Sequence, residues 1–165
     1  CNAIRLLMLT GARKAELLSA TWDQFDLTNG VWTKPGAATK QKTSHRIPLS
    51  APARQLLASM PAESRYVFPG RGGGHQKDIK STWDSMRELA GIPDVRIHDL
   101  RHTYAAQLAS AGLSLPIIGA LLGHTQAQTT ARYSHLMDDP LRQATERVGA
   151  ALGAQDAEDL DKRRA

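Results

Sequence analysis

This sequence contains the residue types that are needed to attack a phosphodiester. They are two arginines, two histidines and a tyrosine. The residues are Arg13, His98, Arg101, His124 and Tyr133, and each stands next to a signal for a turn or for the start of a helix. The guanidinium group stays charged at any accessible pH and presents a fixed fork of N–H donors to phosphate oxygens. Because phosphoryl transfer builds charge on the non-bridging oxygens, fixed cations stabilise its transition state. The set predicts a chain that cuts and rejoins DNA.

Tyr133 is the predicted nucleophile of this set. A phenol is a poor nucleophile at neutral pH because its pKa is near 10, so it needs a base, nearby cations or both. Taken alone, Tyr133 fits a half-buried core tyrosine better, and only the accompanying residues favour chemistry. Tyr66 and Tyr104 have no comparable setting, since one lies beside a loop and the other in the middle of a predicted helix.

Both arginines fall in the first turn of a predicted helix. An arbitrary arginine is most often a surface or salt-bridging residue, and this alternative applies to Arg13 and Arg101 as well. Their position favours anion binding, because the free N–H groups and the dipole at a helix start attract negative charge. Glu16 lies on the same turn as Arg13 and is expected within reach of it.

A zinc site is one alternative for His98 and His102, which are four residues apart on one predicted helix. A zinc protease motif would need Glu directly after the first histidine and a third ligand elsewhere. Asp99 follows instead, and Arg101 would place a permanent cation where the metal should bind. No metal is therefore expected.

The histidines have different expected roles. His98 lies three residues before Arg101, so the imidazole and guanidinium groups are expected on one helix face, directed at one phosphate. His102 is expected to pack or to cap rather than to take part in catalysis. His124 follows Gly123 at a helix end, where it either donates to a phosphate oxygen or only stabilises the helix dipole.

Apolar periodicity predicts a mainly helical domain with a small strand-rich insert. A proline in one strand places that strand at the edge of its sheet, and the Gly-rich stretch 70–74 predicts a loop without the Gly-Lys-Ser/Thr of a phosphate-binding P-loop. The expected helices cover residues 3–9, 12–18, 51–60, 78–90, 98–111, 114–122 and 140–152, with a short one around Tyr133. The expected strands cover 22–27, 31–33 and 45–49, with a hairpin turn at Asn29-Gly30.

Composition sets wider bounds. The 165 residues, 41% hydrophobic and 22% charged, are ordinary for one globular domain. The net charge is +5, with the basic excess before residue 138, which suits a polyanionic partner but also a generic basic protein. No apolar stretch is long enough to span a membrane, and one cysteine favours a reducing, cytoplasmic setting. Because the chain starts at Cys1 within a helical pattern, we expect a fragment of a longer protein, with a charged, disordered tail over 153–165.

Five segments resemble the catalytic domain of the tyrosine recombinase family, and phage-type integrases in particular. They occur in the family's order and span residues 1 to about 137. The segments are Thr10–Leu18 with Trp22, Thr39-Lys40 before His45–Leu49, His98–Thr103, Leu121–His124 and Tyr133–His135. The resemblance implies a mainly α fold with a small three-stranded antiparallel β-sheet, which is the fold of DNA breaking-rejoining enzymes.

The resemblance also implies catalytic roles. Tyr133 would be the nucleophile that forms a 3′-phosphotyrosyl bond to DNA and frees a 5′-hydroxyl. Arg13 and Arg101 would hold the scissile phosphate, and Glu16 would support the site structurally. Because the phosphotyrosine keeps the energy of the broken bond and the arginines neutralise the charge, the family needs no ATP, no metal and no other cofactor.

Proton transfer and phosphate binding are assigned to a lysine and two histidines by the same resemblance. Lys40 would be the general acid for the leaving 5′-oxygen, His98 would assist proton transfer, and His124 would hydrogen-bond the phosphate. Lys34 and Lys42 lie in the same predicted flexible segment, and the spacing favours Lys40 without excluding Lys42. A lysine there could also only position a phosphate.

Double-stranded DNA is the expected partner, with a homotetramer on synapsed DNA and a monomer for the isolated fragment. Residues 1–152 are expected to form the catalytic domain without the family's N-terminal core-binding domain. The apolar face of helix 140–152 would cover its own domain or dock on a neighbouring protomer, and the resemblance favours docking. Two alternatives remain, which are a type IB topoisomerase-like enzyme and a non-catalytic DNA-binding module of the same fold.

Overall fold

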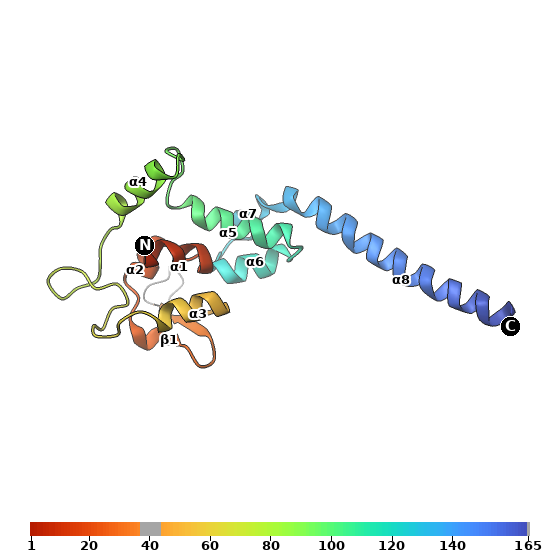
Figure 1. Ribbon diagram of the computed structural model, residues 1–165, viewed down its shortest axis with the longest axis horizontal. Coiled ribbons are helices and arrows are strands. Elements are labelled where there is room, and N and C mark those ends of the chain that lie inside the picture. Colours follow the sequence, from red (N-terminus) through yellow and green to blue (C-terminus); the bar gives the residue numbers. More distant parts are fainter. Residues whose placement is uncertain (37–43, 165) are drawn as a thin grey trace.

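Helices make up most of the chain, and one small sheet lies against them (Figure 1). The computed structural model describes residues 1–36 and 44–164, and the side chains of the last helix as far as residue 151. The helical elements are α1 (Asn2–Thr10), α2 (Lys14–Leu18), the 3₁₀ turn η1 (Trp22–Gln24), α3 (Ala51–Ala58), α4 (Lys80–Leu89), α5 (Asp99–Ser110), α6 (Leu115–Leu122), α7 (Ala127–Ala131), the 3₁₀ turn η3 (Ser134–Met137) and α8 (Asp138–Arg164). The predicted fold class is confirmed.

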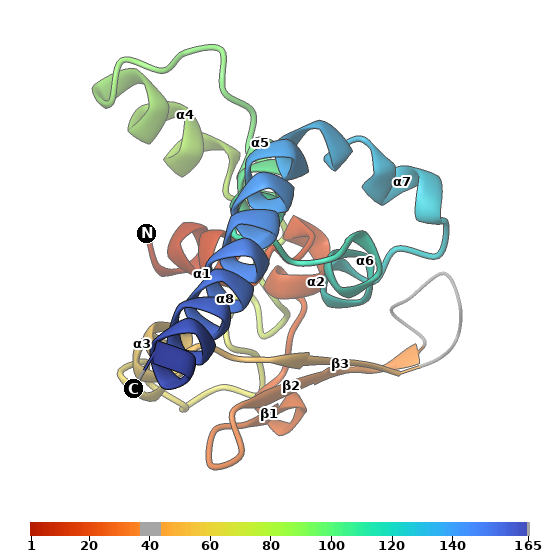
Figure 2. The same cartoon turned by 90° about the vertical axis from the view of Figure 1, so that its right-hand side faces the viewer.

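The sheet is antiparallel, in the order β1 (Phe25–Asp26), β2 (Val31–Lys34) and β3 (His45–Pro48). Pro48 lies on an edge strand, as its missing N–H requires. The first strand is shorter than predicted, because the Gln24 N–H donates to the Thr21 carbonyl at 3.1 Å and closes η1. Lys34 pairs with His45 at the end of the β2–β3 ladder, on the side of the molecule that carries α6 and α7 (Figure 2).

Two hydrophobic clusters hold these elements together. The larger one joins α1 and α3 to the sheet, where Leu6 and Trp32 are fully buried. The smaller one joins α5 and α6, where Ala105 and Ile118 are fully buried. Tyr133 belongs to this smaller cluster and is 7% exposed. Its ring is therefore held by the same apolar packing that fixes α5 against α6.

Gly11 ends α1 in a conformation that favours glycine. Its φ is 60°, and its N–H donates to the Leu7 carbonyl at 3.0 Å. A Cβ at this position would lie 2.4 Å from Cδ1 of Tyr104, so a side chain would push α1 away from α5. The close approach of the two helices places the Gly11 carbonyl within reach of Arg101 on α5.

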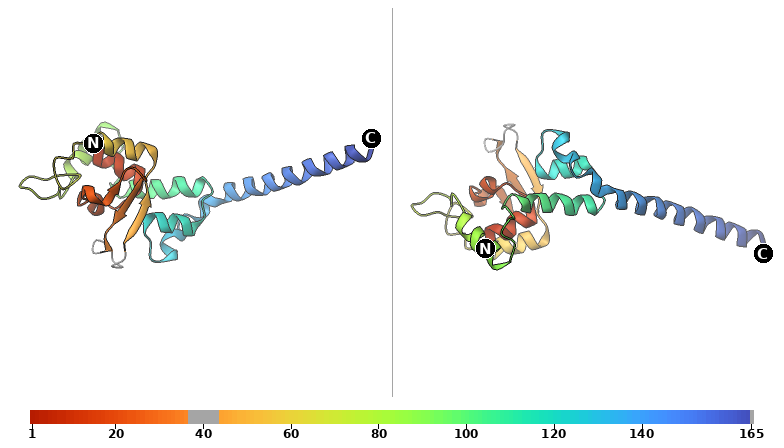
Figure 3. Two further views of the ribbon diagram at one scale, coloured as in Figure 1. Left: turned by 90° about the horizontal axis from the view of Figure 1, so that it is seen from below. Right: turned by 90° about the horizontal axis from the view of Figure 1, so that it is seen from above.

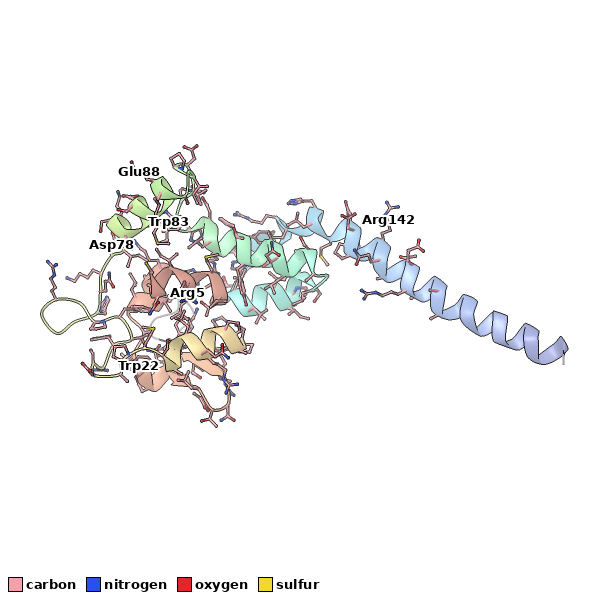
Figure 4. The ribbon with its side chains drawn as sticks, viewed as in Figure 1. Arg5, Trp22, Asp78, Trp83, Glu88 and Arg142 are labelled. Carbon is pink, nitrogen blue, oxygen red and sulfur yellow. The ribbon has the colours of Figure 1, made fainter. Side chains whose placement is uncertain are left out.

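α8 leaves the rest of the chain as a long projecting helix (Figure 3). We expected a helix over 140–152 and then a disordered tail, but the backbone is helical from Asp138 to Arg164. The residues after 152 are mostly good helix formers and include no proline, so local preference does not end the helix there. Leu141 and Val148 are 60% and 59% exposed, and Arg142 stands where α8 has already left the other helices (Figure 4).

No helix in the described part of the chain is both long enough and apolar enough to cross a membrane.

Candidate active site

One cleft brings together those candidate site residues that lie in the described part of the chain. The cleft has a volume of about 1020 Å³ and lies between α2, the start of α5, the end of α6 and the α7–η3 segment. Its charged and titratable lining residues are Arg13, Glu16, His45, Arg96, His98, Arg101, His102, His124, Arg132 and Tyr133. Both arginines, the histidines and the tyrosine thus share a single site.

Arg101 is fixed in the wall of the cleft by main-chain carbonyls. Its Nη1 donates to the Gly11 carbonyl and its Nη2 to the Leu122 carbonyl, both at 2.7 Å, and the residue is 5% exposed. Burial lowers the pKa of Arg101 to about 10, and the nearby charge of Arg13 adds to this effect. The guanidinium group is still charged at neutral pH and lines the cleft, so it can attract an anion.

Arg13 occupies the N-cap of α2, one position before the first turn in which it was expected. Its Nη1 bonds to Oε1 of Glu16 at 2.7 Å, and its backbone N–H donates to Oε2 of the same carboxylate at 3.3 Å. Glu16 also reaches Lys34, whose Nζ lies 2.5 Å from Oε2. One carboxylate therefore links a cation of the cleft to a second cation behind it.

Lys34 was expected in a flexible segment, but it lies in strand β2 and points to the buried side of the sheet. Its side chain is 3% exposed, and its Nζ lies 4.6 Å from the centre of the Trp32 ring. Burial lowers the pKa of Lys34, and Glu16 opposes this shift. Burial likewise raises the pKa of Glu16, but Lys34 and Arg13 outweigh it and hold that pKa below its usual value.

Tyr133 lies between α7 and η3, so the predicted short helix is interrupted at the tyrosine itself. Its Oη lies 2.7 Å from Nδ1 of His102 on α5. Burial raises the pKa of the phenol, while the nearby charges of Arg132 and Arg101 lower it. The phenol is therefore protonated at neutral pH and shares a hydrogen bond with an imidazole.

His98 is the N-cap of α5, one turn before His102. The two rings meet edge to face, with their centroids 5.0 Å apart. Burial lowers the pKa of His98, and the charges of His102 and Arg101 add to the effect. Among the residues that the structure describes, no three His, Cys, Asp or Glu side chains gather as they would around a metal ion.

His124 follows Gly123, which ends α6, and its ring is held by Thr130. Its Nδ1 lies 2.8 Å from Oγ1 of Thr130, a residue that is 2% exposed. Burial lowers the pKa of His124 to about 4, and the charges of Arg101 and Arg13 contribute. His124 is thus neutral at pH 7 and carries one ring proton, so its tautomer decides whether it can donate into the cleft.

His45 opens β3 and borders the cleft beside α6. Its Nε2 donates to the Ala120 carbonyl at 2.6 Å, and a Cβ on Gly123 would lie 2.8 Å from the His45 ring. This contact fixes one end of the connection between β2 and β3. Lys40 and Lys42 belong to that connection and lie outside the described residues.

The lining of the cleft is basic. Glu16 is the single acidic side chain among the described residues that line it, and this carboxylate is already paired with two cations. Arg132 lies beside the tyrosine, and Arg96 pairs with Asp99 at 3.0 Å. The positive field of such a lining attracts an anion.

The sequence did not predict the places of several residues of the site, among them Arg96 and Arg132. His102 was expected only to pack or cap, yet it bonds to Tyr133. Thr130 was not predicted as a site residue, although its position one turn before Tyr133 could have indicated that it lies near the site. Lys34 was placed in a flexible segment. No local pattern could have predicted the contact of His102, because its partner Tyr133 lies on a distant segment of the chain.

Comparison with known proteins assigns the chain to a family. Residues 1–139 match the model of the phage integrase family. The integrase of Salmonella phage P22 is 24% identical over 169 residues, which cover 92% of this chain and 43% of that protein. A shufflon-specific DNA recombinase of Escherichia coli is 32% identical over 154 residues, which cover 88% of this chain and 38% of that protein.

The Tn1549 transposon integrase, solved in complex with transposon right end DNA, has a similar structure. The TM-score is 0.73 at 20% sequence identity, over 90% of this chain and 58% of that one. This likeness shows the fold, and the chain spans less than half the length of the two sequence relatives. The family match covers every element from α1 to η3. The chain belongs to the phage integrase family and has the fold of a tyrosine recombinase catalytic domain.

Proposed function

We propose that this chain is the catalytic domain of a site-specific recombinase that cuts and rejoins DNA through Tyr133. The Tyr133 oxygen attacks a backbone phosphorus, the 5′-oxygen leaves, and the 3′-phosphate stays bound to the tyrosine. A 5′-hydroxyl from another strand then attacks the phosphotyrosine and releases the enzyme. Since one phosphodiester is exchanged for another through a phosphotyrosine of similar energy, the cycle needs neither ATP nor a metal ion.

This proposal rests on one observation. Tyr133, Arg13 and Arg101 line the same basic cleft. Arg101 is already held by two carbonyls, so its charge does not have to reorganise when the transition state forms. Glu16 restrains Arg13 in the same way. The two guanidinium groups can therefore act on the non-bridging oxygens of one phosphate.

The remaining roles follow the resemblance to the family. His124 donates a hydrogen bond to the phosphate, and His98 assists proton transfer near the tyrosine. Lys40 supplies the proton that the leaving 5′-oxygen needs, with Lys42 as the alternative lysine for that role. The neighbouring strand ends support this assignment, because His45 fixes the start of β3 beside the cleft.

The partner we propose is double-stranded DNA. The basic lining of the cleft supports it, and so does the similarity to an integrase that was solved with transposon-end DNA. Exchange between two duplexes breaks four strands, so four protomers would assemble on synapsed DNA. The projecting α8, with Leu141 and Val148 exposed, offers a surface through which neighbouring protomers could dock. Without DNA we expect a monomer.

Covalent capture tests the proposal. The chain is incubated with a pool of labelled, nicked duplexes with random centres, so that the short cleaved end diffuses away and the phosphotyrosine persists. We expect a labelled protein band that survives denaturing electrophoresis, and sequencing its DNA gives the bases that flank the captured phosphate.

Two tyrosine variants make the capture decisive. Tyr133→Phe should abolish the adduct and leave DNA binding intact. Tyr66→Phe, which changes a tyrosine outside the cleft, should form the adduct normally. An adduct that persists in Tyr133→Phe would remove Tyr133 from the mechanism, and a wild-type chain that binds the DNA without an adduct would indicate a non-catalytic module.

Recombination and supercoil relaxation differ in the number of protomers that they need. The similar proteins from phage P22 and Escherichia coli are an integrase and a DNA recombinase, which favours strand exchange. With the captured sequence on two duplexes of different length, we expect hybrid products. Relaxed plasmid without hybrid products would indicate topoisomerase-like activity.

A further inference from the structure

His102, which no step above uses, contacts the nucleophilic atom itself. Its Nδ1 lies 2.7 Å from the Tyr133 Oη, and the two ring centroids are 6.3 Å apart. The contact joins α5 to the turn between α7 and η3. It therefore places an imidazole nitrogen at hydrogen-bond distance from the oxygen that has to attack.

The phenol of Tyr133 has to lose its proton during the attack. Burial raises its pKa, so the phenolate is rarer at neutral pH than in a free tyrosine. A proton acceptor must then lie within hydrogen-bond reach of the oxygen. The arginines of the cleft have no lone pair to offer, whereas a neutral imidazole has one.

The other three histidines of the cleft have other contacts, and His45 donates from Nε2 to the Ala120 carbonyl. His124 directs its Nδ1 to Thr130, and His98 meets the His102 ring edge to face. Among the described residues, the hydrogen-bond partner of the Tyr133 Oη is the Nδ1 of His102. The geometry therefore separates His102 from the other three histidines as the one that touches the reacting atom.

We propose that His102 is the general base that accepts the proton of Tyr133, an inference that rests on the proposed function above. As the bond from Oη to phosphorus forms, the Oη–H proton passes to Nδ1. The bond from phosphorus to the 5′-oxygen breaks, and that oxygen takes a proton from the lysine general acid. In the return step the 5′-hydroxyl gives its proton to the lysine, and the departing Tyr133 oxygen recovers its proton from Nδ1.

Several charged and titratable groups face His102, and they divide by sign. Asp99 on α5 is negatively charged, and the charge of His102 is among the causes that lower the pKa of its carboxyl group. Arg101 on α5 and Arg132 before Tyr133 are positively charged and line the same cleft. Among the described residues, the groups near His102 are His98, Asp99 and Arg101 from α5, His124 from the end of α6, and Arg132 and Tyr133 from the turn before η3.

The direction of the hydrogen bond can be measured without DNA. ¹⁵N NMR of the chain labelled at histidine distinguishes a ring nitrogen that accepts from one that carries hydrogen. We expect the neutral His102 ring to have an unprotonated Nδ1 and a protonated Nε2, with the Nδ1 signal shifting in Tyr133→Phe. A protonated Nδ1, donating to the phenol, would overturn the assignment whatever the activity of the chain.

Two variants of His102 separate proton transfer from positioning. His102→Asn keeps a polar atom near the position of Nδ1 but cannot take the proton, and His102→Ala removes the contact. In single-turnover adduct formation on captured duplex, both should be slower by about 10²- to 10³-fold, as expected for loss of a general base. His75→Asn, on a loop outside the cleft, is the matched control and should match the wild type.

The pH profile supplies the readout that a structural role would not change. The wild-type rate should fall as the pH drops through the range in which histidine takes up a proton, and His102→Asn should lose this dependence. A His102→Asn chain with wild-type rate and profile would refute the base and leave the proposed function intact. Absence of any adduct in the wild type would count against the function instead, while the NMR result still decides which atom carries the proton.

Discussion

Glu16 and Lys34 form a buried ion pair directly behind the cleft, with Oε2 and Nζ 2.5 Å apart and side-chain exposures of 10% and 3%. The other oxygen of the same carboxylate bonds to Arg13. A buried charge is tolerated only when it is paired, so the lysine depends on the glutamate. The pair therefore connects the stability of the fold with the position of a cation in the cleft.

Replacing Glu16 should destabilise the chain strongly. Glu16→Gln leaves the Lys34 ammonium buried without its counter-ion, which costs about 3 kcal/mol when one member of such a pair is lost. Urea unfolding followed by tryptophan fluorescence measures the change. Glu88→Gln, at an exposed position of α4, is the matched control. The double variant Glu16→Gln/Lys34→Met should recover part of the loss, and additive effects in this cycle would show that the two residues are not coupled.

The same ion pair predicts how stability depends on pH. The pKa of Glu16 is lower in the folded chain than its ordinary value, so the unfolded state takes up a proton first as the pH falls. The contribution of Glu16 is complete above the ordinary pKa of glutamate and is lost as the pH falls through the lowered pKa of the folded state. Urea unfolding from pH 7 down to pH 3 should show a steeper loss for the wild type than for Glu16→Gln. Parallel curves would contradict the lowered pKa.

His124 should stay neutral far below the pH at which a free histidine is protonated. Burial and the neighbouring arginines lower its pKa to about 4. Because that pKa is below the unfolded value, the unfolded state binds the proton first, and His124 reduces stability as the pH falls from about 6.5 to 4. An NMR titration of the histidine ring protons should give one resonance with a midpoint near pH 4 that disappears in His124→Asn. A midpoint near 6.5 for that resonance would show that neither burial nor the arginines lower the pKa of His124.

Thr130 should control which nitrogen of His124 carries the proton. To donate to a phosphate from Nε2, the neutral ring has to accept at Nδ1, and the Thr130 hydroxyl lies 2.8 Å from that atom. Thr130→Val keeps the buried shape but removes the donor, so adduct formation should slow about 10-fold, the worth of one hydrogen bond. Thr130→Ser should retain the wild-type rate. Equal loss in both variants would point to packing rather than to the hydroxyl.

The sequence predicted the local structure well, because its signals are local. Apolar periodicity located the helices, and Gly11 and Gly123 mark the ends of α1 and α6 as expected. Pro48 placed β3 at the edge of the sheet. The residue types of the cleft could also be chosen in advance, since arginine, histidine and tyrosine near helix ends suit chemistry on a phosphate.

The contacts between distant segments could not be predicted in the same way. The carbonyl that holds Arg101 belongs to Gly11, which is distant in sequence, and nothing near Arg101 indicates it. The hydrogen bond between His102 and Tyr133 depends on the packing of α5 against the α7–η3 segment. Lys34 was misplaced because a lysine in a strand is usually exposed, whereas here the alternation of β2 directs it inward to a carboxylate.

A sulfur atom in the DNA should identify the general acid between Lys40 and Lys42. A thiolate leaves without being protonated, because the pKa of a thiol is about 8.5 and that of an alcohol is far higher. With ordinary captured duplex, loss of the general acid should slow adduct formation about 100-fold, and a bridging 5′-sulfur should restore the rate. We expect this pattern for Lys40→Ala and a nearly wild-type rate for Lys42→Ala, while the reverse pattern would assign the role to Lys42. His102→Asn should stay slow with sulfur, because a better leaving group does not remove the proton from the tyrosine.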